Sequence, residues 1–137
     1  MGLTDDNRRD IVAYRIERAF TALDQAKKNA EINCLEVTAN RLYYAAHFAV
    51  TALLIAYAIP SHTHDGCITL FGLHFVKTGS VSREMGKLLK NLFTMRQTGD
   101  YSDRFDLKED EVIPKIKPTE EFVVKVTDMA KQKMDML

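Results

Sequence analysis

The sequence has few cysteines, no apolar leader and no excess of either charge, and each of these features excludes a class of protein. Cys34 and Cys67 are too few and too unpatterned for a disulfide framework or a thiolate metal site. The first ten residues, MGLTDDNRRD, lack the apolar core of a secretory signal, so we expect a reducing, cytoplasmic setting. Lys plus Arg number 19, as do Asp plus Glu, so any contact with nucleic acid has to be local.

The sequence also lacks the alternation of apolar and polar residues that marks a half-buried strand, and its β-branched residues lie within helical patterns. At 137 residues the chain is long enough to bury a core as one domain. We therefore predict an all-α fold, an up-and-down bundle of four to five helices, in a single domain over residues 1–137.

Residues 35–60 are predicted to form the central helix of this bundle. They contain no glycine, and their one proline, Pro60, stands at the end, where it closes the helix. From residue 42 to residue 59 the only side chains that are neither apolar nor aromatic are His47 and Thr51. Such a helix is either a core helix or a membrane span. The amphipathic segments on both sides favour a core helix in a protein without a membrane span.

The polar residues of this central helix are gathered on one face. At 100° per residue they fall within about a third of the circumference, and they are Glu36, Asn40, Tyr43, Tyr44, His47 and Thr51. A buried polar group without a partner costs about 1–3 kcal/mol. This polar stripe therefore needs a second helix, a second subunit, water or a ligand against it.

The other helices are predicted from their caps and their apolar periodicity. Thr4 caps a first helix that runs to about residue 30, and residues 61–66 form a loop after the central helix. A helix over residues 67–77 ends before Gly79, and Ser80 or Ser82 caps the next helix, which ends near residue 98. After a polar connection with a possible helical turn at residues 107–112, Thr119 opens the last helix.

Three segments carry a resemblance to a known family: NRLYYAAHFAVTALL, HDGCITLFGLHFVKTGSVSREMGKLLKNLF and MRQTGDYSD. Together they resemble the HEPN domain family, in its branch of small stand-alone prokaryotic proteins often encoded beside a nucleotidyltransferase. The similarity covers roughly residues 8–103. It implies a helical bundle that forms a homodimer. Several members are ribonucleases that use an arginine and a histidine four to six residues apart, and others are known only as partners of the nucleotidyltransferase.

The resemblance places the family's arginine on Arg41, the nearby polar residue on Asn40 and the aromatic pair on Tyr43 and Tyr44. The histidine falls on His47, one position earlier than in close relatives. Six steps of 100° separate Arg41 from His47, which leaves them about 120° apart on an ideal helix. If the pair is catalytic, His47 takes the proton of a ribose 2′-hydroxyl and Arg41 holds the charge that develops on the phosphate.

A second family signature consists of Arg96, Asp100 and Tyr101. These residues straddle the end of a helix, so Arg96 either satisfies terminal carbonyl groups or pairs with Asp100. The functional alternative places Arg96 near Arg41 at a dimer cleft, where two chains would supply local positive charge.

A third group, His62, His64, Asp65 and Cys67, contains metal-capable side chains, but HxHD in a loop between helices is not a zinc pattern. We expect no metal and no cofactor here. His64, which matches a histidine common in the family, is expected to cap or pack the loop.

Two functions therefore stay open. The first is a metal-independent endoribonuclease, or the toxin of a toxin–antitoxin pair, that acts at a dimer cleft. For the first function, Tyr43 or Tyr44 is expected to stack on an exposed base or to orient the histidine. The second is a module that binds RNA or a nucleotide, or docks a nucleotidyltransferase, without cleaving anything. A purely structural alternative pairs Arg41 with a carboxylate such as Asp100 and leaves His47 bonded to a neighbouring hydroxyl.

Overall fold

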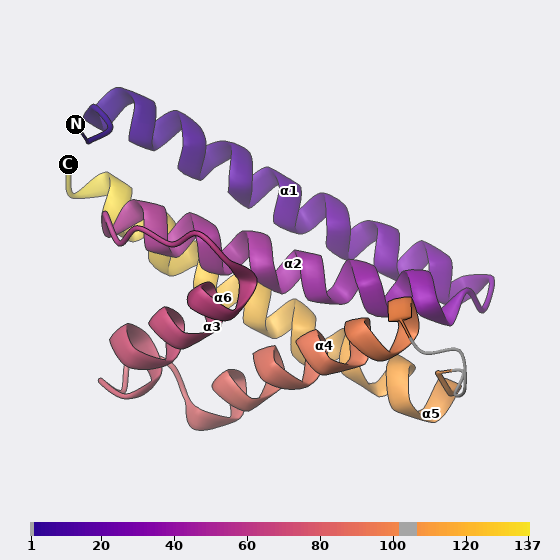
Figure 1. Cartoon of the computed structure of the whole chain (residues 1–137). Helices are drawn as coiled ribbons and strands as arrows, with labels where there is room; N and C mark the ends of the chain where they lie inside the picture. Colours follow the sequence, from indigo (N-terminus) through magenta and orange to yellow (C-terminus); the bar gives the residue numbers. More distant parts are fainter. Residues whose placement is uncertain (1, 102–106) are drawn as a thin grey trace.

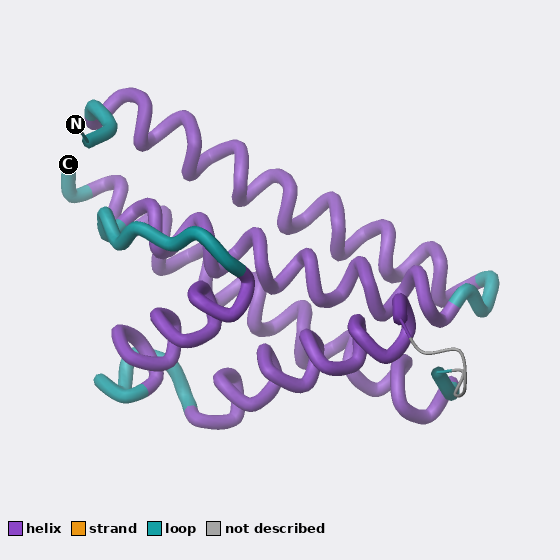
Figure 2. The backbone as a smooth tube through the Cα atoms, in the orientation of Figure 1, coloured by secondary structure: helices purple, strands orange, loops and turns teal. Residues whose placement is uncertain are grey.

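The computed structural model describes the backbone of residues 2–101 and 107–137, and the side chains of the same residues except 99–101. Within these ranges the chain is helical and contains no strand, which confirms the all-α prediction (Figures 1 and 2). The elements are α1 (Asp5–Glu31), α2 (Leu35–Ala56), α3 (His64–Phe71), the π-helical turn η1 (Gly72–Val76), α4 (Arg83–Tyr101), α5 (Glu109–Val112), the 3₁₀ turn η2 (Ile113–Lys115) and α6 (Ile116–Asp135).

Helix α2 is the centre of the bundle, as predicted. It packs against α1, α3, α4, α5 and α6. In Figure 1, α1 runs antiparallel to α2 along its whole length, α6 lies behind α2, and the two chain ends lie at the same end of the molecule. No helix in the described part of the chain combines the length and the apolar character needed to cross a membrane.

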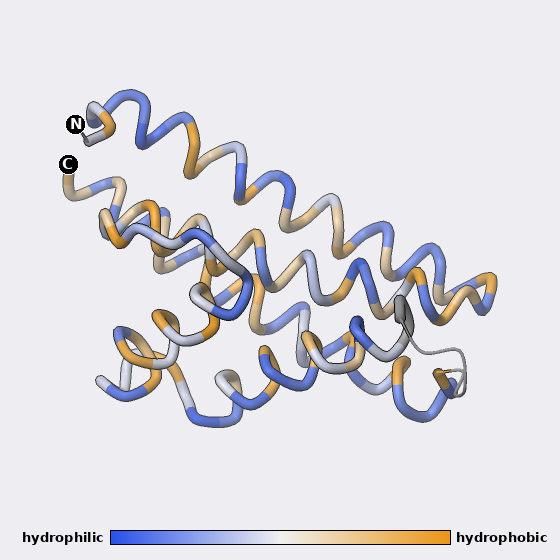
Figure 3. The backbone as a smooth tube through the Cα atoms, in the orientation of Figure 1, coloured by the Kyte–Doolittle hydropathy of each residue, from blue (hydrophilic) through white to orange (hydrophobic). Residues whose placement is uncertain are grey.

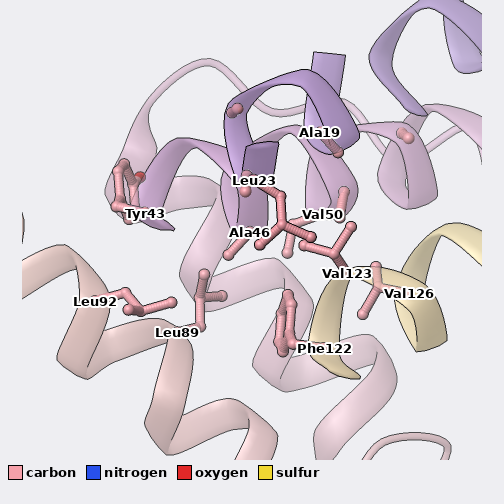
Figure 4. Close-up of a cluster of buried hydrophobic side chains, with 14 of the residues drawn as sticks. Ala19, Leu23, Tyr43, Ala46, Val50, Leu89, Leu92, Phe122, Val123 and Val126 are labelled. Atoms are coloured by element: carbon pink, nitrogen blue, oxygen red, sulfur yellow. The ribbon is translucent and has the colours of Figure 1, made fainter. Parts of the chain in front are cut away.

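The core lies where α2 meets its neighbours, and small residues line it on the α1 side. Ala19, Ala22 and Ala26 of α1 are at most 1% exposed, which lets the two helix backbones approach closely. Figure 4 shows Ala46 and Val50 of α2 among side chains from α1, α4 and α6. Hydrophilic residues predominate along α1, whereas α2 is the more apolar of the two helices (Figure 3).

The uncovered side of α2 overlaps the predicted polar stripe in part, since Tyr43 and Thr51 of the stripe are buried. Beyond the first turn of α2, the only side chains that are not buried are half-buried, and they are Asn40, Arg41, Tyr44, His47, Phe48 and Ile55. Most of them recur at the helical spacing of one side. This side of the central helix is therefore the one that the rest of the described chain leaves partly open.

The start of α1 and the turn that joins α1 to α2 are each formed by a residue whose chemistry favours that position. The hydroxyl of Thr4 accepts a hydrogen bond from the amide of Asn7 at 3.1 Å, which confirms it as the cap of α1. Helix α1 ends before Asn33, which adopts a left-handed φ of 58°. Asparagine tolerates this conformation better than most residues, so the turn to α2 can be short.

The end of α2 differs from the prediction, because the helix stops at Ala56 and not at Pro60. The amide of Ile59 donates to the carbonyl of Leu54 at 2.9 Å, and Ala58 has a φ of 57°. This is the Schellman pattern, in which the chain itself satisfies the last carbonyl groups of the helix. The helix thus terminates through its own backbone before the proline is reached.

After this turn the chain doubles back along α2 before α3 begins, as the teal segment in Figure 2 shows. Residues 61–66 were predicted as a loop, but α3 already starts at His64. Thr63 caps it by accepting a hydrogen bond from the amide of Gly66 at 2.9 Å. The prediction that His64 caps or packs the loop is therefore wrong in its first part, and His64 lies instead on a helix beside the middle of α2.

Of the two later long helices, α4 begins where the sequence predicted and α6 does not. Ser82 accepts a hydrogen bond from the amide of Met85 at 3.2 Å, which confirms it as the cap of α4. Helix α6 starts at Ile116, so Thr119 does not open it. Pro118 lies in the first turn, where a missing N–H group costs nothing. Thr119 is fully buried, and its hydroxyl has no partner among the described residues.

Two neighbouring valines of α6 provide a matched test of this core. Val123 is 0% exposed and Val124 is 52% exposed, so the same change to alanine deletes the same atoms in a buried and an open site. We expect Val123→Ala to lower the free energy of unfolding by about 2 kcal/mol through lost burial and the cavity left behind. Val124→Ala should stay within about 0.5 kcal/mol of the wild type. Urea denaturation measures both, and equal losses would contradict this packing.

Candidate functional site

Side chains from three helices meet on the polar stripe of α2. Tyr43, Tyr44 and His47 come from α2, His64 from the first turn of α3 and Arg96 from α4. We call these five residues the tyrosine–histidine cluster. Each of them has a ring or a guanidinium within 6 Å of another member's ring centre. The stripe therefore obtains within one chain several of the partners that its burial requires.

Tyr43 is the innermost member and is 0% exposed. Its hydroxyl lies 2.6 Å from Nδ1 of His64 and 3.4 Å from Nδ1 of His47. Burial raises the pKa of Tyr43, so the phenol keeps its proton at neutral pH. A phenol has one proton to donate and lone pairs that accept, so Tyr43 can donate to one imidazole and accept from the other. It thereby orients both histidine rings.

The two histidines are stacked on each other. Their ring centres are 4.3 Å apart and the ring planes differ by 2°. Burial lowers the pKa of His47 to about 4, helped by His64 and by the positive charges of Arg15 and Arg96. Burial and Arg96 also lower the pKa of His64, against the opposing effect of Asp65. Both imidazoles are therefore neutral at pH 7, which suits a proton acceptor.

Two arginines lie over the same tyrosine ring. The guanidinium carbons of Arg41 and Arg96 are 5.1 Å and 5.3 Å from the centre of the Tyr44 ring, within the range of cation–π contacts. Tyr44 is also in edge contact with His47, with ring centres 5.9 Å apart. Arg41 and His47, which an ideal helix holds about 120° apart, are thus joined through Tyr44.

Arg41 is held by neutral groups. Its Nε and Nη2 atoms donate to the side-chain oxygen of Asn40 at 3.0 Å and 2.6 Å, and its Nη1 donates to the side-chain oxygen of Gln25 at 3.3 Å. No carboxylate of the described side chains forms an ion pair with it. The side chains of Asp100 and Tyr101 lie outside the described residues, so their predicted roles stay predictions.

The structure thus gathers the predicted residues Asn40, Arg41, Tyr43, Tyr44, His47 and Arg96 along one side of α2. It adds His64, which was not predicted as a site residue. The HxHD pattern drew attention to His64, but nothing in its spacing revealed that the chain doubles back after Ala58. No group of three or more His, Cys, Asp or Glu side chains suited to a metal occurs among the described residues.

A cleft of about 360 Å³ opens beside the two histidines. Its walls are Arg15 of α1, His47 and Thr51 of α2, and the segment of residues 59–64, and we call it the histidine cleft. Arg15 is a second residue that was not predicted for the site. A larger hollow of about 640 Å³ lies between α1 and α6 and contains none of the predicted site residues.

Comparison with known proteins identifies the family of this chain. The sequence matches the HEPN domain over residues 12–129. A UPF0332 protein of Thermotoga maritima is 37% identical over 113 residues, which cover 82% of this chain and 86% of the relative. A UPF0332 protein of Archaeoglobus fulgidus is 31% identical over 85% of this chain and 92% of the relative.

A third relative carries a more specific name. A protein of Methanocaldococcus jannaschii named "Putative toxin" is 32% identical over 100 residues, which cover 73% of this chain and 74% of the relative. The family match extends over most of the chain, and the relatives align over most of their own length. This chain belongs to the HEPN domain family.

Proposed function

We propose that this protein is a metal-independent endoribonuclease of the toxin type that acts at the tyrosine–histidine cluster. One observation carries the proposal: the neutral imidazole of His47 and the guanidinium groups of Arg41 and Arg96 all contact the ring of Tyr44. A proton acceptor and two cations around one aromatic surface are what cleavage of a phosphodiester by its own 2′-hydroxyl requires.

In this reaction His47 takes the proton of the 2′-hydroxyl while the oxygen attacks the phosphorus. Arg41 and Arg96 stabilise the negative charge on the pentacovalent phosphate, and the planar guanidinium suits this task because it donates two parallel hydrogen bonds. Tyr44 supplies a face on which a base can stack. An imidazole with a pKa of about 4 is a weak base. A phosphate bound beside it adds negative charge, which raises its pKa toward neutrality.

The leaving 5′-oxygen needs a proton, and a dimer provides a source for it. The half-buried side of α2 is suited to pack against a second copy around a two-fold axis, which would bring two clusters into one cleft. A histidine of one chain then acts as the base, and one of the other chain, protonated because the bound phosphate raises its pKa, gives its proton to the 5′-oxygen. The relative named "Putative toxin" supports the toxin assignment. A nucleotidyltransferase is the partner that the family resemblance favours as the restraining antitoxin.

A second candidate function follows from the hydrogen bonds of Tyr43. Its hydroxyl engages Nδ1 of both His47 and His64, and the two rings are stacked. A network of this kind can fix the geometry of a site without taking part in chemistry. In that case the protein binds RNA or a nucleotide through Arg41, Arg96 and Tyr44, or docks a nucleotidyltransferase, and cleaves nothing.

Cleavage of RNA by the purified protein separates the two candidates. We expect activity that survives EDTA and falls about 100- to 10,000-fold in His47→Ala, the usual effect of losing a general base. Arg41→Lys should reduce it less than Arg41→Ala, because lysine keeps the charge and loses the fork of donors.

His74→Ala is the matched control, because His74 is an exposed histidine on η1 outside the cluster. Circular dichroism shows whether each variant is folded. Equal activity in the wild type and in folded His47→Ala would assign the cleavage to a contaminant and favour the binding module.

The dimer has its own test on the open side of α2. Phe48 is half-buried there beneath the guanidinium of Arg18, 5.1 Å from the ring centre. We expect light scattering to show a dimer for the wild type at tens of micromolar and a monomer for Phe48→Lys, because an ammonium group beside Arg18 is repelled and loses its hydration at the interface. Val124→Lys, on the exposed face of α6, should remain a dimer. A monomeric wild type would refute the two-chain site.

The lowered pKa of His47 also predicts how stability depends on pH. An unfolded histidine titrates near 6.5, whereas folded His47 titrates at about 4. Between these values the unfolded chain binds more protons, so the free energy of unfolding should fall as the pH is lowered from about 6.5 to about 4. His64 acts in the same direction because its pKa is also lowered.

Urea unfolding at pH 7 and pH 5 measures this effect. The difference between the two pH values should be smaller in His47→Gln than in the wild type, and unchanged in the exposed control His74→Gln. If the free energy of unfolding changes between pH 7 and pH 5 by the same amount in His47→Gln as in the wild type, the pKa of His47 is not lowered in the folded protein.

A further inference from the structure

The histidine cleft adjoins His47, which also belongs to the tyrosine–histidine cluster. His47 touches the ring of Tyr44, which carries both arginines, and it also lines the cleft. The volume of about 360 Å³ falls within the range of about 300–1,000 Å³ typical of small-molecule sites. A strand that crosses His47 therefore has a surface for one nucleotide at Tyr44 and a hollow for its neighbour.

The charge on the α1 wall of this cleft is positive. At 100° per residue Arg8, Arg15 and Arg18 lie within about 80° of one another, whereas Glu17 and Asp24 lie on the opposite side of α1. Among the described side chains, none of these three arginines forms an ion pair with a carboxylate. The neutral composition of the whole chain thus conceals an uncompensated cationic flank on α1.

Arg15 is the arginine of this flank that reaches the cleft. It is half-buried and lines the cleft together with His47 and His64. Burial lowers the pKa of His47, and the positive charge of Arg15 on the same cleft adds to this effect. Ile55 and Ile59 provide an apolar part of the lining, suited to the face of a base or to a ribose. The cleft thus combines one cation with an apolar surface, as nucleotide sites do.

We propose that the histidine cleft binds the nucleotide next to the scissile phosphate of single-stranded RNA, with Arg15 as the ligand of its phosphate. The inference rests on the proposed function, because it takes His47 as the reacting group between the two nucleotides. A duplex cannot place one base against Tyr44 and the next in a hollow, so the substrate is a strand with splayed bases. Arg15 positions the substrate and does not take part in the reaction.

Binding of an RNA that cannot be cleaved tests this subsite apart from catalysis. The probe is a short fluorescein-labelled 2′-O-methyl oligoribonucleotide, whose blocked 2′-oxygen cannot attack the phosphate. Fluorescence anisotropy at several salt concentrations gives its affinity and the number of phosphates contacted. We expect Arg15→Gln to bind about tenfold more weakly, the effect of one lost charge-assisted contact. Its salt slope should fall by about 0.7, the value for one phosphate of a single strand.

Arg9→Gln is the matched control, because it removes the same charge from the same helix. Arg9 donates to Asp6 and to the terminal Leu137 carbonyl, and it does not line the cleft. Arg15→Lys should keep the salt slope and lose part of the affinity, and it covers the case that Arg15→Gln does not fold. Equal affinity and slope for wild type and folded Arg15 variants would overturn the subsite even if RNA is cleaved.

Failure of the proposed function gives a different result. A wild type that binds the probe in an Arg15-dependent way but leaves unmodified RNA intact would refute the ribonuclease and keep the phosphate subsite. Adenosine monophosphate serves as a competitor that distinguishes a strand from a free nucleotide. Displacement of the oligonucleotide only at a large excess supports the RNA strand, whereas Arg15-dependent binding of the mononucleotide at equal affinity would overturn the assignment to RNA.

Discussion

The site depends on the burial of one phenol. Tyr43 lies in the middle of the central helix and is 0% exposed, so its hydroxyl needs a partner inside the protein. His64 meets this need at 2.6 Å, and the chain can present His64 only because it reverses at Ala58 and runs back along α2. The stacked histidines and the cleft beside them follow from this one requirement. A polar residue in the core is thus hydrogen-bonded to the first residue of a helix at the surface.

Most of the fold could be predicted from local patterns, and the errors show where such patterns stop being sufficient. Periodicity located the long helices, and Thr4 and Ser82 act as the caps that their chemistry suggests. Three boundaries were predicted wrongly, namely the end of α2, the start of α3 and the start of α6, and the first and the last of these lie beside prolines. Helix α2 ends before Pro60 through backbone hydrogen bonds, and α6 accommodates Pro118 in its first turn. A proline excludes a helix only where its missing N–H group would have been bonded.

The spacing on the central helix indicated Asn40, Tyr43, Tyr44 and His47 as candidate site residues. The family resemblance added Arg41 and Arg96. His64 and Arg15 were beyond such reasoning. Their place depends on the path of residues 57–63 and on the packing of α1, which are tertiary facts that no spacing records. On an ideal helix Arg41 and His47 are about 120° apart, and their spacing alone does not show how they could act together. Both side chains touch Tyr44, so an aromatic ring joins two residues that the helix holds apart.

Arg15 and Arg96 affect two steps of the proposed chemistry, the binding of the phosphate and the removal of a proton by His47. Burial lowers the pKa of both His47 and His64; Arg15 and Arg96 add to this effect on His47, and Arg96 adds to it on His64, so both imidazoles are neutral at pH 7. A phosphate bound by these arginines neutralises the positive charge that weakens the base. His47 therefore becomes a better proton acceptor when a phosphodiester is present. Under the proposed function this coupling links substrate binding to the strength of the base, and the neutral total charge of the chain gives no sign of it.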